Sequence, residues 1–400
     1  MLKISRDLAQ IFAADLILRW SYQMGKSPVL PLFAAAIGAA EMMTGLIVAV
    51  STFTGMLFKP LFGMLSDRWG RRVWLLFSLT VFCAMPFLYR FVETPDQLLA
   101  LRLVHGLATS ILGPVSLSYV AELDRDNRAT NLAIFGMSRS MASLAAPICA
   151  AFALLYIDIE TVFTLIGFTS LLAAIPLINL NEPKQNSAMS RATIKAQVAD
   201  ALCSSLQSQA VWLAGLLELM VYLATYAIRA FLPLFILAQE NGTILQAGLF
   251  FTVQEAAHIA MRPIGGRLAD RRGYGFAIVL GLAVLTLGVG VLPWLAGSLL
   301  LLSAGLLGAG QAMIFPASVA FLAQATKEGH RGAGMGFYGA LRNVGKVAGP
   351  VLSGILLTYF SFLAVFTGFA VVMAAAAIIG AGQLSHRRIR RESQLVSGQD

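Results

Sequence analysis

The chain alternates long apolar runs with short polar breaks. Twelve of these runs come close to the roughly 20 residues that a helix needs to cross the hydrocarbon core of a membrane. An apolar run in lipid must satisfy its backbone hydrogen bonds internally, so each run is predicted to be a helix. The alternation of single apolar and polar residues that is typical of transmembrane strands is absent from the sequence. The predicted spans lie near 8–33, 42–65, 73–92, 97–121, 131–156, 160–180, 211–237, 245–268, 275–296, 298–323, 333–358 and 361–382.

The polar break at 181–209 is much longer than the others and separates two sets of six predicted spans. We therefore predict an all-α membrane protein whose twelve transmembrane helices form two pseudo-symmetric six-helix bundles. The N-terminal bundle covers 1–180 and the C-terminal bundle covers 210–384. The segment 181–209 is predicted to be a cytoplasmic linker, and 385–400 a basic cytoplasmic tail.

A sequence pattern near the end of the second predicted span returns near the end of the eighth. Paired residues in the two copies lie 203 positions apart (262 minus 59, and 273 minus 70). An ungapped repeat of this kind predicts two similar halves in the same orientation, with a polar pathway at their interface. The pairs are Lys59 with Arg262, Pro60 with Pro263, Gly63 with Gly266, Leu65 with Leu268, Asp67 with Asp270, Arg68 with Arg271 and Gly70 with Gly273, and the same spacing relates Asp15 to Glu218, Lys26 to Arg229 and Arg139 to Arg342.

The composition supports a membrane location. Hydrophobic residues make up 58% of the chain and charged residues 12%, whereas a soluble domain carries about 25% charged residues. The net charge of +9 does not indicate a nucleic-acid partner, because most basic residues lie in the breaks between apolar runs. These residues concentrate on one side, which predicts that both termini are cytoplasmic and that the chain lies in the inner membrane. Cys83, Cys149 and Cys203 lie too far apart for a metal or disulfide motif.

Several ionisable residues lie inside predicted spans, where each costs roughly 2.5–3.5 kcal/mol on insertion scales. Predicted spans six, nine and twelve contain none in their interiors. Those three spans are therefore expected to face lipid, while the others surround a wet pathway. The candidates for substrate binding and coupling are Asp15, Arg19, Lys26, Arg102, Arg139, Glu218, Arg229, Glu255, His258, Arg342 and Lys346.

Helical spacing relates some of these candidates. Asp15 and Arg19 are an i,i+4 pair within reach of each other, and a structural ion pair that fixes the rotation of the helix is an equally good interpretation. Arg342 and Lys346 are an i,i+4 pair of like charge, which predicts either a carboxylate from another helix or an anionic ligand beside them. Glu218 has no basic residue at i+3 or i+4, so it is the candidate proton carrier.

Other candidates have structural alternatives. A lone histidine such as His258 is typical of a hydrogen-bonded packing residue, although Glu255 on the same helix face strengthens a role in transport. Arg139 and Arg342 are either helix-packing donors to backbone carbonyls or residues of a cavity. Their equivalent positions in the two halves favour the cavity.

Motifs along nearly the whole chain resemble those of the major facilitator superfamily. The pattern G-x-L-x-D-R-x-G-R-R over Gly63–Arg72 resembles the signature between helices two and three of that family, and Gly266–Gly273 resembles its partner between helices eight and nine. Arg102–Gly106 resembles the R-x-x-x-G element of the fourth helix. Gly345–Gly354 resembles the glycine-proline element of the family's drug antiporters, although here the clear copy lies in span eleven instead of span five.

The paired signatures imply a gate. Gly63 and Gly266 are expected to let helices approach closely. Asp67 and Asp270 are expected to accept hydrogen bonds from the N-terminus of a neighbouring helix and from an arginine. Such contacts would hold the cytoplasmic side shut and break when it opens, although basic residues there also set topology and stabilise the fold. The gating candidates are Gly63, Asp67, Arg68, Gly70, Arg71, Gly266, Asp270 and Arg271.

The resemblance implies a secondary active transporter that works by alternating access. Its leading form is proton-coupled efflux of a small organic solute, with the proton gradient as energy source in place of a cofactor. The implied partners are a small-molecule substrate, protons and membrane lipid, without nucleic acid or metal, and the chain is expected to be a monomer.

Two further functions stay open. One is proton-coupled transport of an organic anion, because basic candidates outnumber carboxylates. The other is a sensor that keeps the fold without transport. An enzyme is not expected, because the sequence contains neither G-x-S-x-G nor H-E-x-x-H. A stretch that loosely resembles a phosphate loop, Gly339–Val347, has the wrong glycine spacing and lacks the hydroxyl residue.

Overall fold

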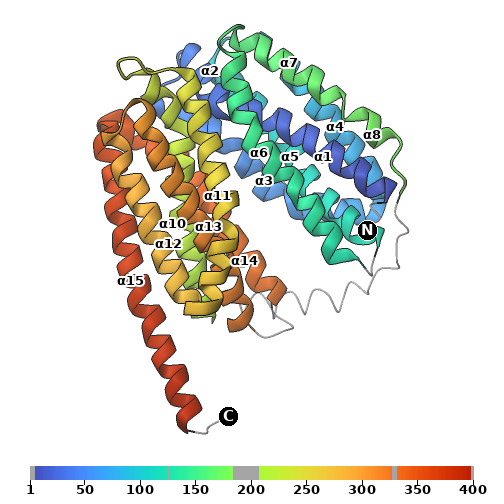
Figure 1. Cartoon of the computed structure of the whole chain (residues 1–400). Coiled ribbons are helices and arrows are strands. Elements are labelled where there is room, and N and C mark those ends of the chain that lie inside the picture. The colour runs from blue at the N-terminus through green and yellow to red at the C-terminus, as the bar shows by residue number, and fades with distance from the viewer. Residues whose placement is uncertain (1–4, 125–126, 183–206, 327–330, 398–400) are drawn as a thin grey trace. The chain divides into compact units, whose positions relative to one another are not determined.

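The computed structural model is helical throughout its described part (Figure 1). Most of the predicted linker, at 183–206, lies outside the described residues. The last helix, α15 (Phe362–Ser397), continues well past the predicted end of the twelfth span at 382 and into the predicted tail. The described residues are 5–124, 127–182, 207–326 and 331–397.

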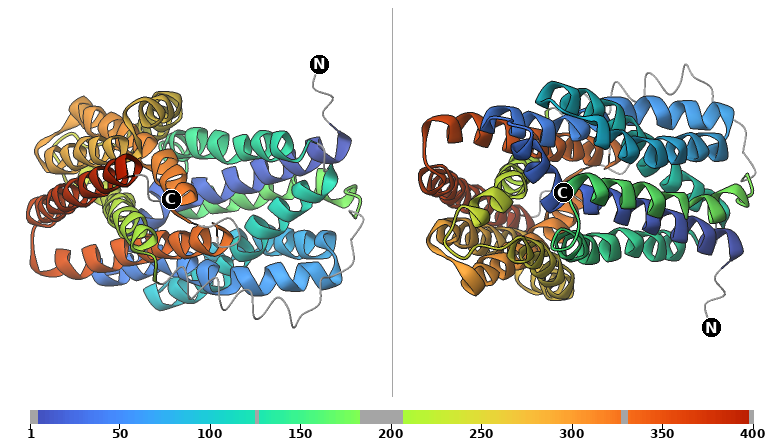
Figure 2. Two further views of the ribbon diagram at one scale, coloured as in Figure 1. Left: turned by 90° about the horizontal axis from the view of Figure 1, so that it is seen from below. Right: turned by 90° about the horizontal axis from the view of Figure 1, so that it is seen from above.

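The N-terminal part of the chain contains α1 to α8. Within it, α5 packs against both α3 and α4, and α1 packs against α6 (Figure 2). Buried apolar residues from α1, α4, α5 and α8 form a shared core, which includes Leu8, Leu75, Ile111 and Leu177. The elements are α1 (Arg6–Met24), η1 (Gly25–Val29), α2 (Leu30–Ala36), α3 (Glu41–Trp69), α4 (Arg71–Leu88), η2 (Tyr89–Phe91), α5 (Pro95–Leu123), α6 (Arg128–Ala153), α7 (Ile159–Leu171) and α8 (Ala174–Ile178).

The C-terminal part contains α10 to α15. Here α12 packs against α13 and α15. Glycines bring α12 and α13 close together, because a Cβ on Gly281 would lie 2.9 Å from the Gly310 carbonyl oxygen, and one on Gly310 would lie 2.7 Å from the Gly281 oxygen. The elements before α15 are α10 (Gln209–Leu237), α11 (Ile244–Arg272), α12 (Tyr274–Val291), η3 (Leu292–Trp294), η4 (Gly297–Leu299), α13 (Leu300–Ala325) and α14 (Arg331–Tyr359).

Two compact units divide the chain. Unit 1 combines the N-terminal helices with parts of α10, α11 and α14. Inside this unit, Gly45 of α3 lies against the backbone of Pro350, and Gly248 of α11 lies against the backbone of Pro147. The predicted division at 180 and 210 stays a prediction. Unit 1 spans Met1–Ala188, Ala227–Glu255 and Val347–Tyr359, and unit 2 spans Met189–Tyr226, Ala256–Lys346 and Phe360–Asp400.

Polar residues at the breaks define where several helices begin. Ser5 caps α1 by accepting from the Leu8 N–H at 3.2 Å, and Thr94 caps α5 in a capping box with Gln97. Asp158 caps α7, and hydrogen bonds from Thr161 lower the pKa of its exposed carboxyl. These caps explain why the chain turns from loop to helix at those positions.

The first predicted span is not one continuous helix. α1 ends at Met24, the turn Gly25–Val29 follows, and a short second helix completes the segment. Ser27 within the turn has extended backbone angles, φ −149° and ψ 123°. The cause is Pro28, which lacks an N–H and excludes the helical conformation for the residue before it. Lys26 therefore lies in an irregular turn and not on a regular helix.

Nine helices of the described part are long and apolar enough to cross a membrane. The first, eighth and eleventh predicted spans are missing from this set. They are among the most charged, because the first contains Asp15, Arg19 and Lys26, and α14 contains Arg342 and Lys346. The number twelve therefore stays a prediction that depends on these three polar segments.

The two copies of the sequence repeat have the same local structure. Gly70 has φ +93° and ψ 150°, and Gly273 has φ +93° and ψ 151°. Each glycine follows a helix of 29 residues and precedes one of 18 residues. Only glycine adopts this backbone region without strain, which explains why both copies require it.

Candidate functional site

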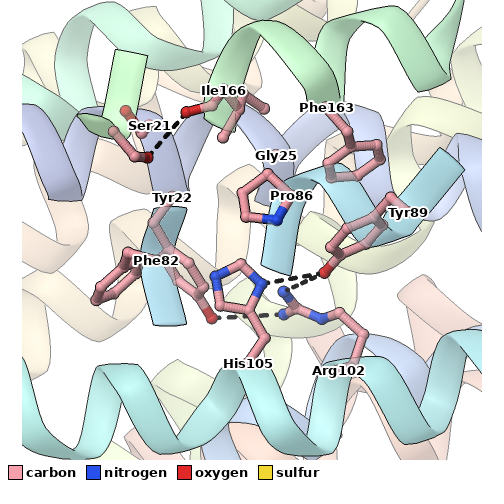
Figure 3. Close-up of a pocket in the computed structure, with 11 residues that line it drawn as sticks. Ser21, Tyr22, Gly25, Phe82, Pro86, Tyr89, Arg102, His105, Phe163 and Ile166 are labelled. Atoms are coloured by element: carbon pink, nitrogen blue, oxygen red, sulfur yellow. Dashed lines mark hydrogen bonds between the residues drawn. The ribbon is translucent and has the colours of Figure 1, made fainter. Parts of the chain in front are cut away.

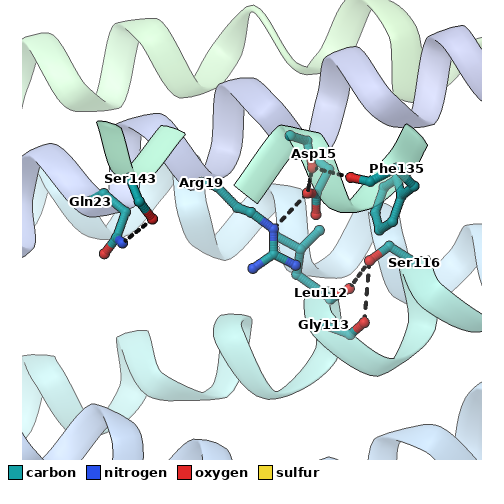
Figure 4. Close-up of polar contacts among 9 residues, drawn as sticks. Asp15, Arg19, Gln23, Leu112, Gly113, Ser116, Phe135 and Ser143 are labelled. Atoms are coloured by element: carbon teal, nitrogen blue, oxygen red, sulfur yellow. Dashed lines mark hydrogen bonds and ion pairs between the residues drawn. The ribbon is translucent and has the colours of Figure 1, made fainter. Parts of the chain in front are cut away.

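The first polar cluster joins α1 to α6 (Figure 4). Asp15 is fully buried, and its Oδ2 accepts from Arg19 Nε at 2.6 Å and from the Ser138 hydroxyl at 2.5 Å. One helical turn further along the pair, Gln23 Nε2 donates to the Ser143 hydroxyl at 3.1 Å. The Asp15–Arg19 ion pair expected from the spacing is present, and Ser138 ties it to α6. Ser138 was not among the predicted site residues, but it directly precedes the candidate Arg139.

The second cluster surrounds Arg102 of α5, which is 2% exposed (Figure 3). Its Nη2 donates to the Ser51 hydroxyl at 2.6 Å and to the Tyr22 hydroxyl at 3.4 Å, and its Nη1 donates to the Tyr89 hydroxyl at 3.4 Å. All of the hydrogen-bond partners found for its side chain in the described part are hydroxyls. A buried guanidinium is thus solvated by three neutral groups from three elements instead of by a carboxylate.

His105 extends this cluster on the same face of α5. Its Nδ1 lies 3.2 Å from the Tyr89 hydroxyl, which already accepts from Arg102. The Tyr89 hydroxyl therefore joins His105 to the Arg102 guanidinium. His105, Arg102 and the two tyrosines line a small cavity together with Phe82.

Sequence reasoning identified Arg102 but none of its partners. Tyr22 carried a usable signal, because it lies seven residues after Asp15 and thus on the same helix face. Ser51 and Tyr89 lie on other helices and carried no local signal.

The third cluster lies in unit 2, between α10 and α14. Glu218 of α10 is 1% exposed and lies within electrostatic range of Arg342 and Lys346. Its Oε2 has no hydrogen-bond partner in the described part. The two helices touch through Gly345, where a Cβ would lie 2.4 Å from the Leu219 carbonyl oxygen. The sequence predicted either a carboxylate or an anionic ligand beside Arg342 and Lys346, and the carboxyl group near them in the described part is that of Glu218.

Aromatic rings surround the two cations of this cluster. The Arg342 guanidinium carbon lies 5.7 Å from the ring centroid of Tyr222 and 5.6 Å from that of Phe315. The Lys346 ammonium lies 4.8 Å from the Tyr222 ring and 5.8 Å from the Tyr226 ring. Ring faces within about 6 Å stabilise cations, so the rings partly offset the like-charge repulsion. Two cations, one carboxyl and flat apolar faces are suited to an organic ligand with an aromatic part.

The remaining candidates pair locally. Arg229 Nη2 lies 4.0 Å from Glu255 Oε2, which joins α10 to α11 within unit 1. Arg262 Nε donates to His258 Nε2 at 3.4 Å. Lys26 lies with its ammonium 5.9 Å from the Tyr22 ring. Glu255 and His258, which the sequence places on one helix face, thus have different partners.

The gating signature of the first repeat forms an ionic network. Arg71 is 6% exposed, and its Nη2 and Nε donate to the two carboxylate oxygens of Glu122 at 2.6 and 3.3 Å. The same guanidinium forms an ion pair with Asp67 and donates to the Ser66 hydroxyl at 2.7 Å. Arg68 is exposed, next to this network. Glu122 was missed by sequence reasoning because it lies 51 residues away.

Among the described residues, the second signature shows no equivalent of this network. Tyr274 stands at the position equivalent to Arg71, and Asp270 and Arg271 are exposed. A Cβ on Gly63 or on Gly266 would meet no described atom within 4 Å. Close approach of helices at these two glycines therefore stays a prediction.

Comparison with known proteins agrees with this geometry. The sequence profile of the Major Facilitator Superfamily matches residues 17–217 and again 214–396, which is once for each half of the repeat. The chain belongs to the major facilitator superfamily. As a member of that superfamily, with many apolar helices, it is a multi-pass integral membrane protein of a transporter family, whose substrate is a small molecule.

Relatives in this superfamily match over most of their length. The chain is 22% identical over 370 residues to the uncharacterized MFS-type transporter MJ1560 of Methanocaldococcus jannaschii, covering 91% of this chain and 94% of the relative. It is 23% identical over 378 residues to the multidrug resistance protein MdtG of Salmonella arizonae, covering 91% of this chain and 92% of the relative.

Solved structures share the fold. The nucleoside transporter NupG has a TM-score of 0.81 at 12% identity over 95% of this chain and 99% of that one, and the peptide transporter POT has 0.77 at 14% over 95% and 94%.

Proposed function

We propose that the chain is a proton-coupled secondary active transporter that moves a small organic solute by alternating access. In this proposal, twelve spans form two six-helix bundles over 1–180 and 210–384, joined by a cytoplasmic linker over 181–209, and both termini lie in the cytoplasm below the inner membrane. The internal repeat and the superfamily membership support the two-bundle arrangement. The transporter is proposed to act as a monomer without a cofactor.

The proposal of proton coupling rests on the surroundings of Glu218. It is a nearly fully buried carboxyl with an unpartnered oxygen in the described part, beside two cations and three aromatic rings. A carboxyl that gains or loses a proton there changes the net charge of the cluster by one. A proton thereby changes the affinity of the cluster for a charged solute, which is the physical requirement for coupled transport.

Efflux is the direction that we propose first. The support comes from the relative named multidrug resistance protein, which matches over 91% of this chain. Proton-driven efflux requires that proton and solute compete. A cationic solute meets this requirement, because protonation of Glu218 leaves Arg342 and Lys346 to repel it.

Transport of an organic anion is the second candidate, favoured by the pair of cations on α14. Protonation of Glu218 would remove the negative charge that competes for Arg342 and Lys346, so an anion and a proton would bind together. That sign of coupling predicts symport instead of antiport. The two candidates are therefore distinguished by the direction in which a pH gradient drives the solute.

The test uses purified protein in proteoliposomes with an imposed pH gradient. Ethidium serves as an aromatic cation and naphthalene-1-sulfonate as an aromatic anion that stays ionised throughout. Antiport predicts that ethidium accumulates in acid-inside vesicles, and symport predicts that the sulfonate accumulates in alkaline-inside vesicles. Protein-free liposomes measure leakage. Absence of gradient-dependent flux for both probes contradicts the two candidates and favours a sensor without transport.

A further inference from the structure

The first turn of α4 is capped by a residue that lies 110 positions away in the sequence. Gly70 precedes this helix and has no side chain, so the first backbone N–H groups lack a local acceptor. Glu182 supplies it: Oε1 accepts from the Arg71 N–H at 2.5 Å and Oε2 from the Arg72 N–H at 2.9 Å. A carboxylate at a helix N-terminus is favoured by the helix dipole as well as by the hydrogen bonds.

The chain leading to Glu182 is itself held in place. The Tyr119 hydroxyl of α5 donates to the Asn181 carbonyl oxygen at 2.7 Å. Arg72 Nη2 donates to the Ile178 carbonyl oxygen at 2.6 Å. The end of α8 and the residues after it are thus bonded to both α4 and α5. Although Glu182 is exposed, the backbone that leads to it is held by hydrogen bonds at Ile178 and Asn181.

Arg71 belongs to the cap and to the gating network at once. Its backbone N–H binds Glu182, while its guanidinium binds Glu122, Asp67 and the Ser66 hydroxyl. The direction of a side chain follows from the position of its own backbone. Glu182 therefore fixes the backbone from which the arginine reaches the two acids.

The second repeat offers an internal comparison. Gly273 has the same φ of +93° as Gly70, but a Cβ on Gly273 would meet no described atom within 4 Å, whereas one on Gly70 would lie 3.1 Å from Glu182 Oε1. Tyr274 replaces Arg71 in that copy. Within the described part, the carboxylate cap and the arginine network thus occur together in the first copy and are both missing from the second.

We propose that Glu182 is a positioning residue of the gate: it holds the start of α4 so that the Arg71 guanidinium stays on Glu122 and Asp67. The consequence for transport rests on the proposed function, whereas the contacts and the test below do not.

The test is hydrogen exchange of the full-length protein in lipid nanodiscs, read at the Arg71 and Arg72 amides and at the end of α5 around Glu122. Glu182→Ala is expected to speed exchange at the two α4 amides by about fivefold, the factor that corresponds to about 1 kcal/mol for a lost cap. Exchange at the end of α5 is expected to rise as well, because the arginine no longer holds Glu122. Glu182→Gln keeps one acceptor oxygen and is expected to give a smaller change at both places.

Glu93→Ala is the matched control, because it removes an exposed carboxylate beyond the opposite end of α4. It should leave exchange at both reported places unchanged. An increase confined to the first turn of α4 would overturn the proposal, because Glu182 would then be a helix cap alone. Unchanged exchange in Glu182→Ala would overturn it entirely. Neither outcome depends on finding a transported solute, so the proposed function is tested separately.

Discussion

Replacing Glu218 with glutamine removes one titratable group while leaving the side chain nearly the same size. The native carboxyl is 1% exposed, so the neutral amide avoids the desolvation of a buried charge. We therefore expect Glu218→Gln to fold, with the melting temperature of the variant measured beside that of the native protein. The change in function is then attributable to the lost proton and not to lost structure.

The size of the effect follows from the driving force carried by one proton. A difference of one pH unit across the membrane is worth about 1.4 kcal/mol per proton, which corresponds to about tenfold accumulation of a coupled solute. If Glu218 carries the coupled proton, the variant loses that tenfold accumulation. Exchange of solute down its own concentration gradient should continue, because Arg342, Lys346 and the aromatic rings are retained.

The assay measures gradient-driven accumulation and downhill exchange in the same proteoliposomes, with ethidium and naphthalene-1-sulfonate as probes. Glu240→Gln is the control, since Glu240 is an exposed carboxyl just after α10. It should behave as the native protein does. Accumulation by Glu218→Gln that equals the native value would refute the reasoning and remove Glu218 from the coupling mechanism.

Three further predictions concern single contacts. Ser138→Ala removes the hydrogen bond to the buried Asp15 carboxylate and should lower the free energy of unfolding by about 1.5–3 kcal/mol. Ser143→Ala removes the neutral hydrogen bond from Gln23 and should lower it by about 0.5–1.5 kcal/mol. Equal losses in the two variants would contradict the charged contact. Gly70→Ala and Gly273→Ala introduce the same backbone strain of about 1–3 kcal/mol. Only the Cβ at position 70 would also displace the Glu182 carboxylate from the start of α4, so Gly70→Ala should lower the melting temperature more. Equal falls would argue against this cap. Arg342→Gln should weaken naphthalene-1-sulfonate binding roughly tenfold in equilibrium dialysis and leave ethidium binding unchanged or stronger, and unaltered sulfonate binding would exclude the anion site.

The sequence predicted the features that depend on local pattern. Spans follow from apolar length, and the repeat follows from spacing, which the shared φ of Gly70 and Gly273 reflects. The Asp15–Arg19 pair follows from helical periodicity. All of these involve residues within a few turns of each other or an ungapped comparison.

Contacts between distant segments were not accessible from the sequence. Ser51 and Tyr89 solvate Arg102 from other helices, and Glu182 reaches α4 across 110 positions. Gly63 shows a further limit of sequence reasoning. A small residue permits close approach of helices, but whether a neighbour occupies that space depends on tertiary structure, and no described atom lies within 4 Å of it.

The most direct test of proton-coupled transport is the internal pH of vesicles during solute entry. Proteoliposomes loaded with the pH-sensitive dye pyranine are mixed with ethidium or naphthalene-1-sulfonate in the absence of an imposed pH gradient. Coupled transport predicts that the interior becomes alkaline as ethidium enters by antiport, or acid as the sulfonate enters by symport, and that Glu218→Gln abolishes the change. Solute entry with a constant internal pH in the native protein would contradict proton coupling.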